Sequence, residues 1–354
     1  MKHLSKKLKF TKQKMQAFQQ KVRWLDEFKG FWQGHLNISP QILHRLKKFT
    51  LITSTGASTR IEGSYLSDEE VEKILTGLKI QKLRDRSQQE VAGYAELTKL
   101  IFDEHKRIKW NENQIKHFHK ILLRYSKKDS HHRGKYKKGS NAVVARDNAG
   151  NEKIIFNPTP PYLTPKKMEE LVEFTKENLK TKELHPLFII GHFIGEFLAI
   201  HPFQDGNGRL SRALTNLLLL QEGYSYVQYV SLEKIIEDWK EKYYLALRKS
   251  QKNRQAEKHD LTPWMEFFLA TLVQQTKYAK TILERRNIED ELSEKQLAIL
   301  RFLRAEKMGL SVREIVEKSG FNRNTVRKVL ERLRNLRLIK QVGLGRASRW
   351  RAGK

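Results

Sequence analysis

Residues 201–212 read His-Pro-Phe-Gln-Asp-Gly-Asn-Gly-Arg-Leu-Ser-Arg and are the most informative part of the sequence. Gly206 and Gly208 allow positive φ angles, which can turn successive backbone N–H groups toward one anion. An apolar helical pattern begins at Leu210, so these N–H groups would also lie at the positive end of a helix dipole. The stretch therefore predicts a phosphate-binding turn between two helices.

The charged side chains of the same stretch suit a nucleotide. Arg209 and Arg212 are three residues apart and share one helical face, where their forked donors can bind phosphate oxygens. Asp205 would repel a phosphate unless a divalent cation such as Mg²⁺ lay between them. His201 follows an apolar helix and can accept a proton. The alternative interpretation is a structural turn between buried helices, with both arginines solvated.

The rest of the sequence is mostly helical in pattern. Apolar residues recur every three or four positions over residues 168–179, 187–200, 210–222 and 232–249. Residues 142–145 and 153–156 are short β-prone runs on either side of an Asp/Asn/Gly cluster, which predicts a β-hairpin. Three prolines within residues 158–161 then end that hairpin. A mainly α fold with a hairpin in its middle part follows.

Composition limits the classes of function. The 354 residues include no cysteine, which excludes disulfides, thiolate metal sites and cysteine nucleophiles. No apolar run suits a membrane span, and the basic start lacks the apolar core of a signal peptide, so we expect a cytoplasmic protein. Delivery outside the producing cell stays open. The net charge is +29, of which residues 1–50 carry +10 and residues 292–354 carry +12, and this predicts anionic partners.

Residues 201–212 match every fixed position of the Fic (filamentation induced by cAMP) signature, His-x-Phe-x-(Asp/Glu)-Gly-Asn-Gly-Arg-x-x-Arg. The resemblance implies a helical core with a β-hairpin flap, and transfer of AMP from ATP to a Ser, Thr or Tyr hydroxyl of a target protein. It also implies that His201 is the base, that Asp205 binds Mg²⁺ and that Phe203 is a buried anchor. The ATP-binding residues implied within the signature are Asp205, Gly206, Asn207, Gly208, Arg209, Leu210, Ser211 and Arg212.

Two other regions resemble nucleotide-binding parts of the same family. The predicted hairpin, within residues 139–161, falls where the family has its flap, which aligns the target peptide by strand-like pairing. The flap residues expected near the nucleotide are Ile155, Phe156 and Asn157. Tyr243 and Tyr244 resemble residues of the adenine-side helix, and ordinary core packing explains them equally well.

An upstream segment resembles the family's inhibitory motif, (Ser/Thr)-x-x-x-Glu-(Gly/Asn). Ser58 and Glu62 are four residues apart, hence on one helical face, and Gly63 is suited to end the helix. The resemblance implies that Glu62 pairs with Arg212 and withdraws that guanidinium from ATP. The alternative is a solvated glutamate at the end of a surface helix.

Residues 293–354 have a separate pattern. Helices are predicted around residues 297–303, from Ser311 to Gly320 and over residues 322–336, and a hairpin is predicted over residues 338–351. This order resembles a winged helix-turn-helix. The helix over residues 322–336, the second of the helix-turn-helix pair, would expose candidate nucleic-acid contacts, namely Arg323, Asn324, Arg327 and Lys328. A dimerisation or target-docking module is the alternative.

These observations predict three parts: an N-terminal helical region (1–95) that carries the inhibitory motif at 58–63, a Fic domain (96–285), and a winged helix-turn-helix domain (290–354). The predicted function is an ATP- and Mg²⁺-dependent protein adenylyltransferase that Glu62 inhibits. An enzyme that removes AMP and a nucleotide-sensing, DNA-binding regulator are the alternatives. The expected partners are ATP, a target protein and DNA, without a membrane, and a homodimer is considered.

Overall fold

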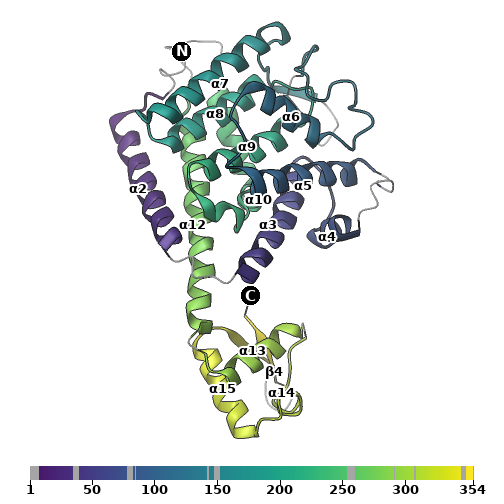
Figure 1. The fold of residues 1–354 in the computed structure, drawn as a ribbon, viewed down its shortest axis with the longest axis vertical. Helices are drawn as coiled ribbons and strands as arrows, with labels where there is room; N and C mark the ends of the chain where they lie inside the picture. Colours follow the sequence, from purple (N-terminus) through teal and green to yellow (C-terminus); the bar gives the residue numbers. More distant parts are fainter. Residues whose placement is uncertain are drawn as a thin grey trace. The chain divides into compact units, whose positions relative to one another are not determined.

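The computed structural model describes residues 8–34, 40–77, 83, 85–141, 143–146, 152–252, 260–290, 292–306, 308–343 and 348–353. The fold is mainly α, as predicted (Figure 1). The chain divides into two compact units, residues 1–279 and residues 280–354. Within the described ranges, every helix is too short or too polar to cross a membrane. The finer division into three parts stays a prediction.

The larger unit is built mainly from helices, with a β-hairpin in the connection between α6 and α7. Its helices are α2 (Lys12–Gly34), α3 (Pro40–Ile61), α4 (Asp68–Gly77), α5 (Arg86–Glu104), α6 (Glu112–Leu122), α7 (Thr164–Thr181), α8 (Pro186–Ile200), α9 (Asn207–Gln221), α10 (Leu232–Asp238), α11 (Lys240–Gln251) and the first part of α12 (Thr262–Asp290). Two 3-10 turns, η2 (Pro161–Leu163) and η3 (Ser225–Gln228), complete it.

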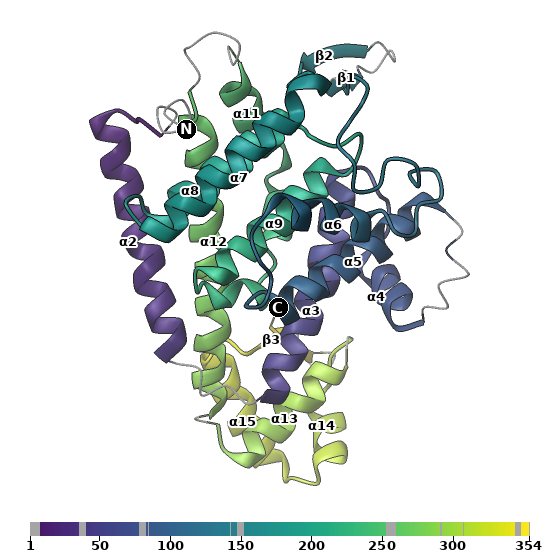
Figure 2. The same cartoon turned by 45° about the horizontal axis from the view of Figure 1, so that its top comes forward.

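The core of this unit forms around α8. This helix is mostly apolar, and every residue from Leu187 to Ile200 is buried, as expected for a helix surrounded by others. It packs against α7 and α9, and α7 and α8 lie side by side in Figures 1 and 2. Because α9 is also buried along almost its whole length, both ends of the intervening loop are fixed. That loop consists of residues 201–206, the first half of the signature.

The predicted hairpin is present. Strands β1 (Val143–Arg146) and β2 (Glu152–Phe156) pair antiparallel, with a bulge between Val143 and Val144. Strand β2 packs against α11, and Figure 2 shows both strands. The hairpin is therefore next to the helix that carries the two candidate adenine-side tyrosines.

One predicted helix is wrong in extent. The pattern over residues 232–249 predicts a single helix, but the structure has two, because the chain leaves helical geometry at Trp239 (φ −109°, ψ 27°). The apolar spacing continues across the break, since Ile235 and Tyr243 are both buried. Periodicity therefore did not reveal the change of direction.

The smaller unit has its own core. It contains α13 (Glu294–Ala305), α14 (Val312–Ser319), α15 (Arg323–Asn335) and the antiparallel strands β3 (Ile339–Val342) and β4 (Arg349–Ala352). As predicted, Ser311 caps α14 and Gly320 ends it in a left-handed conformation. The apolar residues of α15 are buried in this core, namely Val326, Val329, Leu330 and Leu333. This unit is the predicted helix-turn-helix with a C-terminal hairpin.

Candidate active site

His201 directly follows α8 as its C-cap residue and has left-handed backbone angles (φ 52°, ψ 60°). Its Nδ1 lies 3.3 Å from the Leu198 carbonyl oxygen. Because a carbonyl only accepts, Nδ1 carries the proton and Nε2 keeps its lone pair. Burial lowers the pKa of His201 to about 4, and the hydrogen bond to Leu198 offsets this only in part. The imidazole is therefore neutral at pH 7 and can accept a proton through Nε2.

Two asparagines hold the loop after His201. Asn207 accepts from the Phe203 N–H (2.9 Å) and donates to the Phe203 carbonyl (2.7 Å). Asn141, which precedes the hairpin, donates to the carbonyls of His201 (3.0 Å) and Phe203 (2.7 Å). The signature asparagine thus fixes the shape of the loop with its side chain, and Asn141 ties the loop to the base of the flap.

Phe203 is fully buried, as predicted, and stacks on His119 of α6 with ring centroids 3.9 Å apart. His119 Nδ1 accepts from the Gly134 N–H (2.8 Å), so its proton is on Nε2, which lies 3.0 Å from the Asp205 carbonyl oxygen. Burial lowers the pKa of His119 to about 4. A neutral histidine therefore connects α6 with the loop directly before Gly206.

Asp205 belongs to a ring of alternating charges. Its Oδ2 accepts from Arg86 of α5 (2.9 Å) and from Arg209 of α9 (2.9 Å). Glu90 bonds the same two arginines, at 2.8 Å from Arg86 and 3.2 Å from Arg209. Burial by itself would raise the pKa of Asp205, but Arg209, the Gly206 N–H and Arg86 hold it below its usual value. Asp205 is therefore ionised at neutral pH.

The start of α9 has the geometry of an anion site. Gly206 caps the helix with φ +79°, an angle that suits glycine. The first helical hydrogen bond runs from the Leu210 N–H to the Gly206 carbonyl, so the amides of residues 207–209 precede the helical ladder. Leu210 and Ser211 have buried side chains. These two predicted ATP contacts therefore do not present their side chains at the surface.

Arg212 contacts the predicted inhibitory segment. The guanidinium is buried and donates to Ser58 Oγ (2.8 Å), to the Ser58 carbonyl (2.9 Å) and to Glu62 Oε1 (2.7 Å). The structure thus brings Ser58 and Glu62 to Arg212, which lies 154 and 150 positions further along the chain. Glu62 follows the last residue of α3, and its N–H bonds the Thr59 carbonyl in the closing turn. Gly63 has φ +104°, which suits the predicted helix end.

The Glu62 carboxylate lies over Gly208, at the anion site. A Cβ atom placed on Gly208 would come within 2.2 Å of Glu62 Oε1. Only glycine leaves room for the carboxylate at this position, and the positive end of the α9 dipole favours a negative charge there. The side chain of Glu62 remains 32% exposed, so it can be reached from solvent.

The tyrosines and hairpin residues that were expected near the nucleotide differ in their burial. Tyr243 is buried beside Trp264 and Phe267, and it lines, with Arg212, a cavity of about 20 Å³. Tyr244 is 40% exposed and its hydroxyl lies 3.3 Å from the Ile61 carbonyl oxygen. In the flap, Phe156 is partly buried and Asn157 is exposed, whereas the side chain of Ile155 is outside the described residues.

The candidate metal ligand fits Mg²⁺ only together with a nucleotide. Among the residues that the structure describes, no three His, Asp or Glu side chains gather as a metal site. Mg²⁺ in nucleotide sites is usually held by one or two carboxylates, with phosphates and water completing the shell. Asp205 is ionised and its side chain is 33% exposed, so it meets that limited requirement.

Several site residues were not predicted from the sequence. His119 belongs to none of the sequence motifs, yet it supports the loop at Phe203 and Asp205. Arg86 and Glu90 complete the charge ring from α5. Neither belongs to a recognisable motif, so their connection to Asp205 depends on tertiary packing alone.

Comparison with known families finds one matching segment in each of the two units. Residues 109–219 match the model of the Fic/DOC family, and residues 294–343 match that of the IclR helix-turn-helix domain. The chain therefore carries a Fic/DOC domain followed by a helix-turn-helix domain.

Relatives and solved structures agree with this assignment. A probable protein adenylyltransferase of Aquifex aeolicus is 32% identical over 116 residues, which are 32% of this chain and 35% of the relative. A Fido domain-containing protein of Dictyostelium discoideum is 30% identical over 88 residues, or 24% of this chain and 62% of that protein. The alignments thus span about a third of the first relative and less than two thirds of the second.

Two solved structures show the same fold. A Fic family protein from Desulfovibrio desulfuricans has a TM-score of 0.61 at 24% identity, and the match covers 95% of each chain. A Fic domain-containing signaling protein from Bacteroides thetaiotaomicron has a TM-score of 0.60 at 19% identity, covering 73% of this chain and 96% of the other.

Proposed function

We propose that this chain is a Mg²⁺-dependent protein adenylyltransferase and that Glu62 restrains its activity. The observation that carries the proposal is the convergence of three groups on the loop between α8 and α9: a neutral His201, an ionised Asp205 and the first amides of α9. The Aquifex relative is named a probable protein adenylyltransferase, which supports the same reaction.

The reaction would be in-line displacement at the α-phosphorus of ATP. The target hydroxyl oxygen forms a bond to that phosphorus, the bond to the bridging oxygen of the β-phosphate breaks, and pyrophosphate leaves. His201 Nε2 takes the hydroxyl proton. The first amides of α9 bind phosphate oxygens. Asp205 would hold Mg²⁺, which neutralises phosphate charge when bound. The protein then contributes mainly orientation and charge stabilisation.

Restraint by Glu62 follows from where its carboxylate lies. It occupies the space over Gly208 and accepts from Arg212, so it takes both the helix N-terminus and a guanidinium that phosphate oxygens would otherwise use. A phosphate and this carboxylate repel each other at one site. ATP must therefore displace Glu62 or bind with its phosphates misaligned.

The test is transfer of label from ATP radiolabelled at the α-phosphate, with Mg²⁺, in a lysate of a related cell. We expect the Glu62→Gly variant to label itself or a target more strongly than wild type does. Adding His201→Ala to that variant should lower the rate of label transfer by about 10²–10⁴-fold. Asp260→Asn, an exposed loop substitution, is the control that should match wild type. An unlabelled Glu62→Gly sample would rule out adenylyl transfer.

A second candidate function, DNA binding, is favoured by the surface of α15. The side chains of Arg323, Asn324, Arg327 and Lys328 are exposed. Asn322, Arg323 and Lys328 contribute to the lining of a surface hollow of about 370 Å³ at the start of this helix. We expect the full chain to retard duplex DNA in a salt-dependent manner, and Arg323→Ala/Lys328→Ala to reduce the salt slope by about two. Equal retardation by wild type and the double variant would contradict this function.

A further inference from the structure

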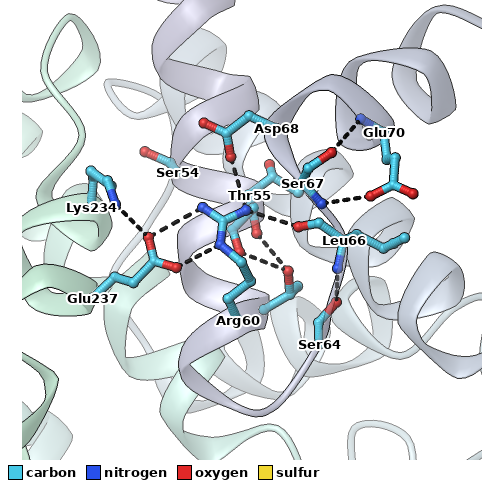
Figure 3. A network of polar contacts seen from close by, with 12 residues as sticks. Ser54, Thr55, Arg60, Ser64, Leu66, Ser67, Asp68, Glu70, Lys234 and Glu237 are labelled. Atoms are coloured by element: carbon cyan, nitrogen blue, oxygen red, sulfur yellow. Dashed lines mark hydrogen bonds and ion pairs between the residues drawn. The ribbon is translucent and has the colours of Figure 1, made fainter.

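Arg60 lies between Ser58 and Glu62 of the inhibitory motif, but its side chain does not take part in their contacts with Arg212. Its Nε donates to Glu237 Oε1 (2.5 Å) and its Nη2 to Glu237 Oε2 (3.2 Å), so the guanidinium and the carboxylate form a fork (Figure 3). The two side chains are only 21% and 18% exposed. A forked and largely buried pair is stronger and more directional than a surface ion pair. Arg60 therefore fastens the end of α3 to α10.

The same guanidinium also fastens α3 to the segment that follows it. Arg60 Nη1 donates to the Leu66 carbonyl (2.9 Å) and to Asp68 Oδ1 (2.9 Å) at the start of α4 (Figure 3). Gly56 provides the space, because a Cβ there would lie 2.5 Å from both Arg60 Nη1 and Asp68 Oδ1. One side chain thus holds the residues before and after Glu62.

The backbone beside Glu62 has weaker supports. The hydroxyl of Tyr244 is 3.3 Å from the Ile61 carbonyl, and Lys240 Nζ is 3.5 Å from the Arg60 carbonyl. The Gly63 N–H also bonds the Arg60 carbonyl, at 3.1 Å. Because Arg60 and Glu62 are two residues apart, the position of the Arg60 backbone determines where the Glu62 carboxylate can reach.

We propose that Arg60 is a positioning residue that, through Glu237 and Asp68, sets how strongly Glu62 restrains the active site. This inference rests on the proposed function of Glu62 as the restraint. The Arg60–Glu237 pair holds the last turn of α3, and the held turn keeps the Glu62 carboxylate on Arg212 and over Gly208. Without the pair, the end of α3 samples other conformations, and a larger fraction of molecules has an open anion site.

The direct experiment measures AMP transfer by the full chain carrying Glu237→Gln or Arg60→Ala. We expect each variant to transfer label about tenfold faster than wild type, which corresponds to a shift of about 1.4 kcal/mol in the opening equilibrium. Arg60→Lys keeps the charge but loses the fork, so its transfer rate should lie between the wild-type rate and the rates of Glu237→Gln and Arg60→Ala. Asp238→Asn is the matched control, because Asp238 is on the same helix and bonds Lys234 rather than Arg60.

Two further measurements separate positioning from general loosening. In the Glu62→Gly background, Glu237→Gln should give no additional gain, since there is no carboxylate left to position. Hydrogen exchange at the amides of residues 62–64 should be faster in Glu237→Gln than in Asp238→Asn. If Arg60→Ala fails to fold, Glu237→Gln still gives the answer.

Unchanged exchange and unchanged transfer in Glu237→Gln would overturn the positioning role. An equal gain from Glu237→Gln with and without Glu62 would also overturn it, because the effect would not pass through the carboxylate. If Glu62→Gly itself transfers no label, the proposed function fails, whereas the exchange rates still report whether Arg60 holds the segment.

Discussion

At the residue scale, the geometry of His201 is maintained by its neighbours. A non-glycine residue in the left-handed region costs about 1–2 kcal/mol, so the surrounding structure must hold it. The His201 N–H bonds the Phe197 carbonyl at the end of α8, and Asn141 bonds the carbonyl of His201. The buried Phe203 ring then fixes the loop two residues later. The candidate base is thus held in place before any nucleotide binds, as catalysis by positioning requires.

His119 should make stability depend on pH. Its pKa is about 4 in the folded chain and about 6.5 when exposed. The unfolded chain therefore binds more protons between these values, so folding stability is lost as the pH falls from about 6.5 through 4, by about 3 kcal/mol in total. The control substitution is at His131, which is exposed. Urea midpoints measured over this range should fall less steeply in His119→Gln than in His131→Gln, and parallel curves would contradict the buried neutral state.

The sequence indicates which residues form the candidate site better than it indicates which other residues hold them in place. The signature residues meet at one loop because they are contiguous, so a motif with local geometry is sufficient to find them. Arg86 and His119 reach the same loop from α5 and α6. Their side chains are connected to it through packing of helices distant in sequence, and no local spacing encodes such a contact.

At the element scale, the crossing of α5 and α6 depends on one glycine. A Cβ on Gly93 would lie 2.0 Å from the Leu122 carbonyl oxygen, whereas a Cβ on Gly30 of α2 would have nothing within 4 Å. Alanine normally stabilises a helix by about 0.5–1 kcal/mol relative to glycine. We expect Gly30→Ala to gain that amount and Gly93→Ala to lose at least about 1–3 kcal/mol through overpacking. Chemical denaturation measures both, and a stabilised Gly93→Ala variant would show that the helices can separate freely.

Helix boundaries show what periodicity can and cannot predict. Cap residues gave the limits of α14 correctly, because Ser311 and Gly320 act through local hydrogen bonds and a positive φ angle. The break between α10 and α11 has no such signal, since buried residues continue across Trp239. The break between α10 and α11 also bears on the proposal that Arg60 positions Glu62. It separates Glu237, which holds Arg60, from Tyr244, which contacts the Ile61 carbonyl.

At the scale of the whole molecule, the segments with the largest net charge are not the segment that forms the candidate active site. The net charge of +29 is concentrated in residues 1–50 and 292–354, whereas the candidate active site uses Arg209 and Arg212, both paired with acids. The basic composition therefore predicts anionic partners but does not indicate where the candidate active site lies. The motif indicates that candidate site, and the separate pattern of the tail predicts a unit with its own core.

Because each unit has its own core, each should have its own unfolding transition. Leu333 is fully buried in the core of the smaller unit, and Leu171 of α7 is fully buried in the larger one. Truncation of a buried leucine to alanine costs about 2–5 kcal/mol, which in a domain as small as residues 280–354 lowers the melting temperature by roughly 8 °C or more. In calorimetry of the full chain, we expect Leu333→Ala to lower one transition and Leu171→Ala to lower the other. If both substitutions move a single shared transition, the two units fold as one cooperative body, and the proposed DNA-binding and AMP-transfer functions would be energetically coupled.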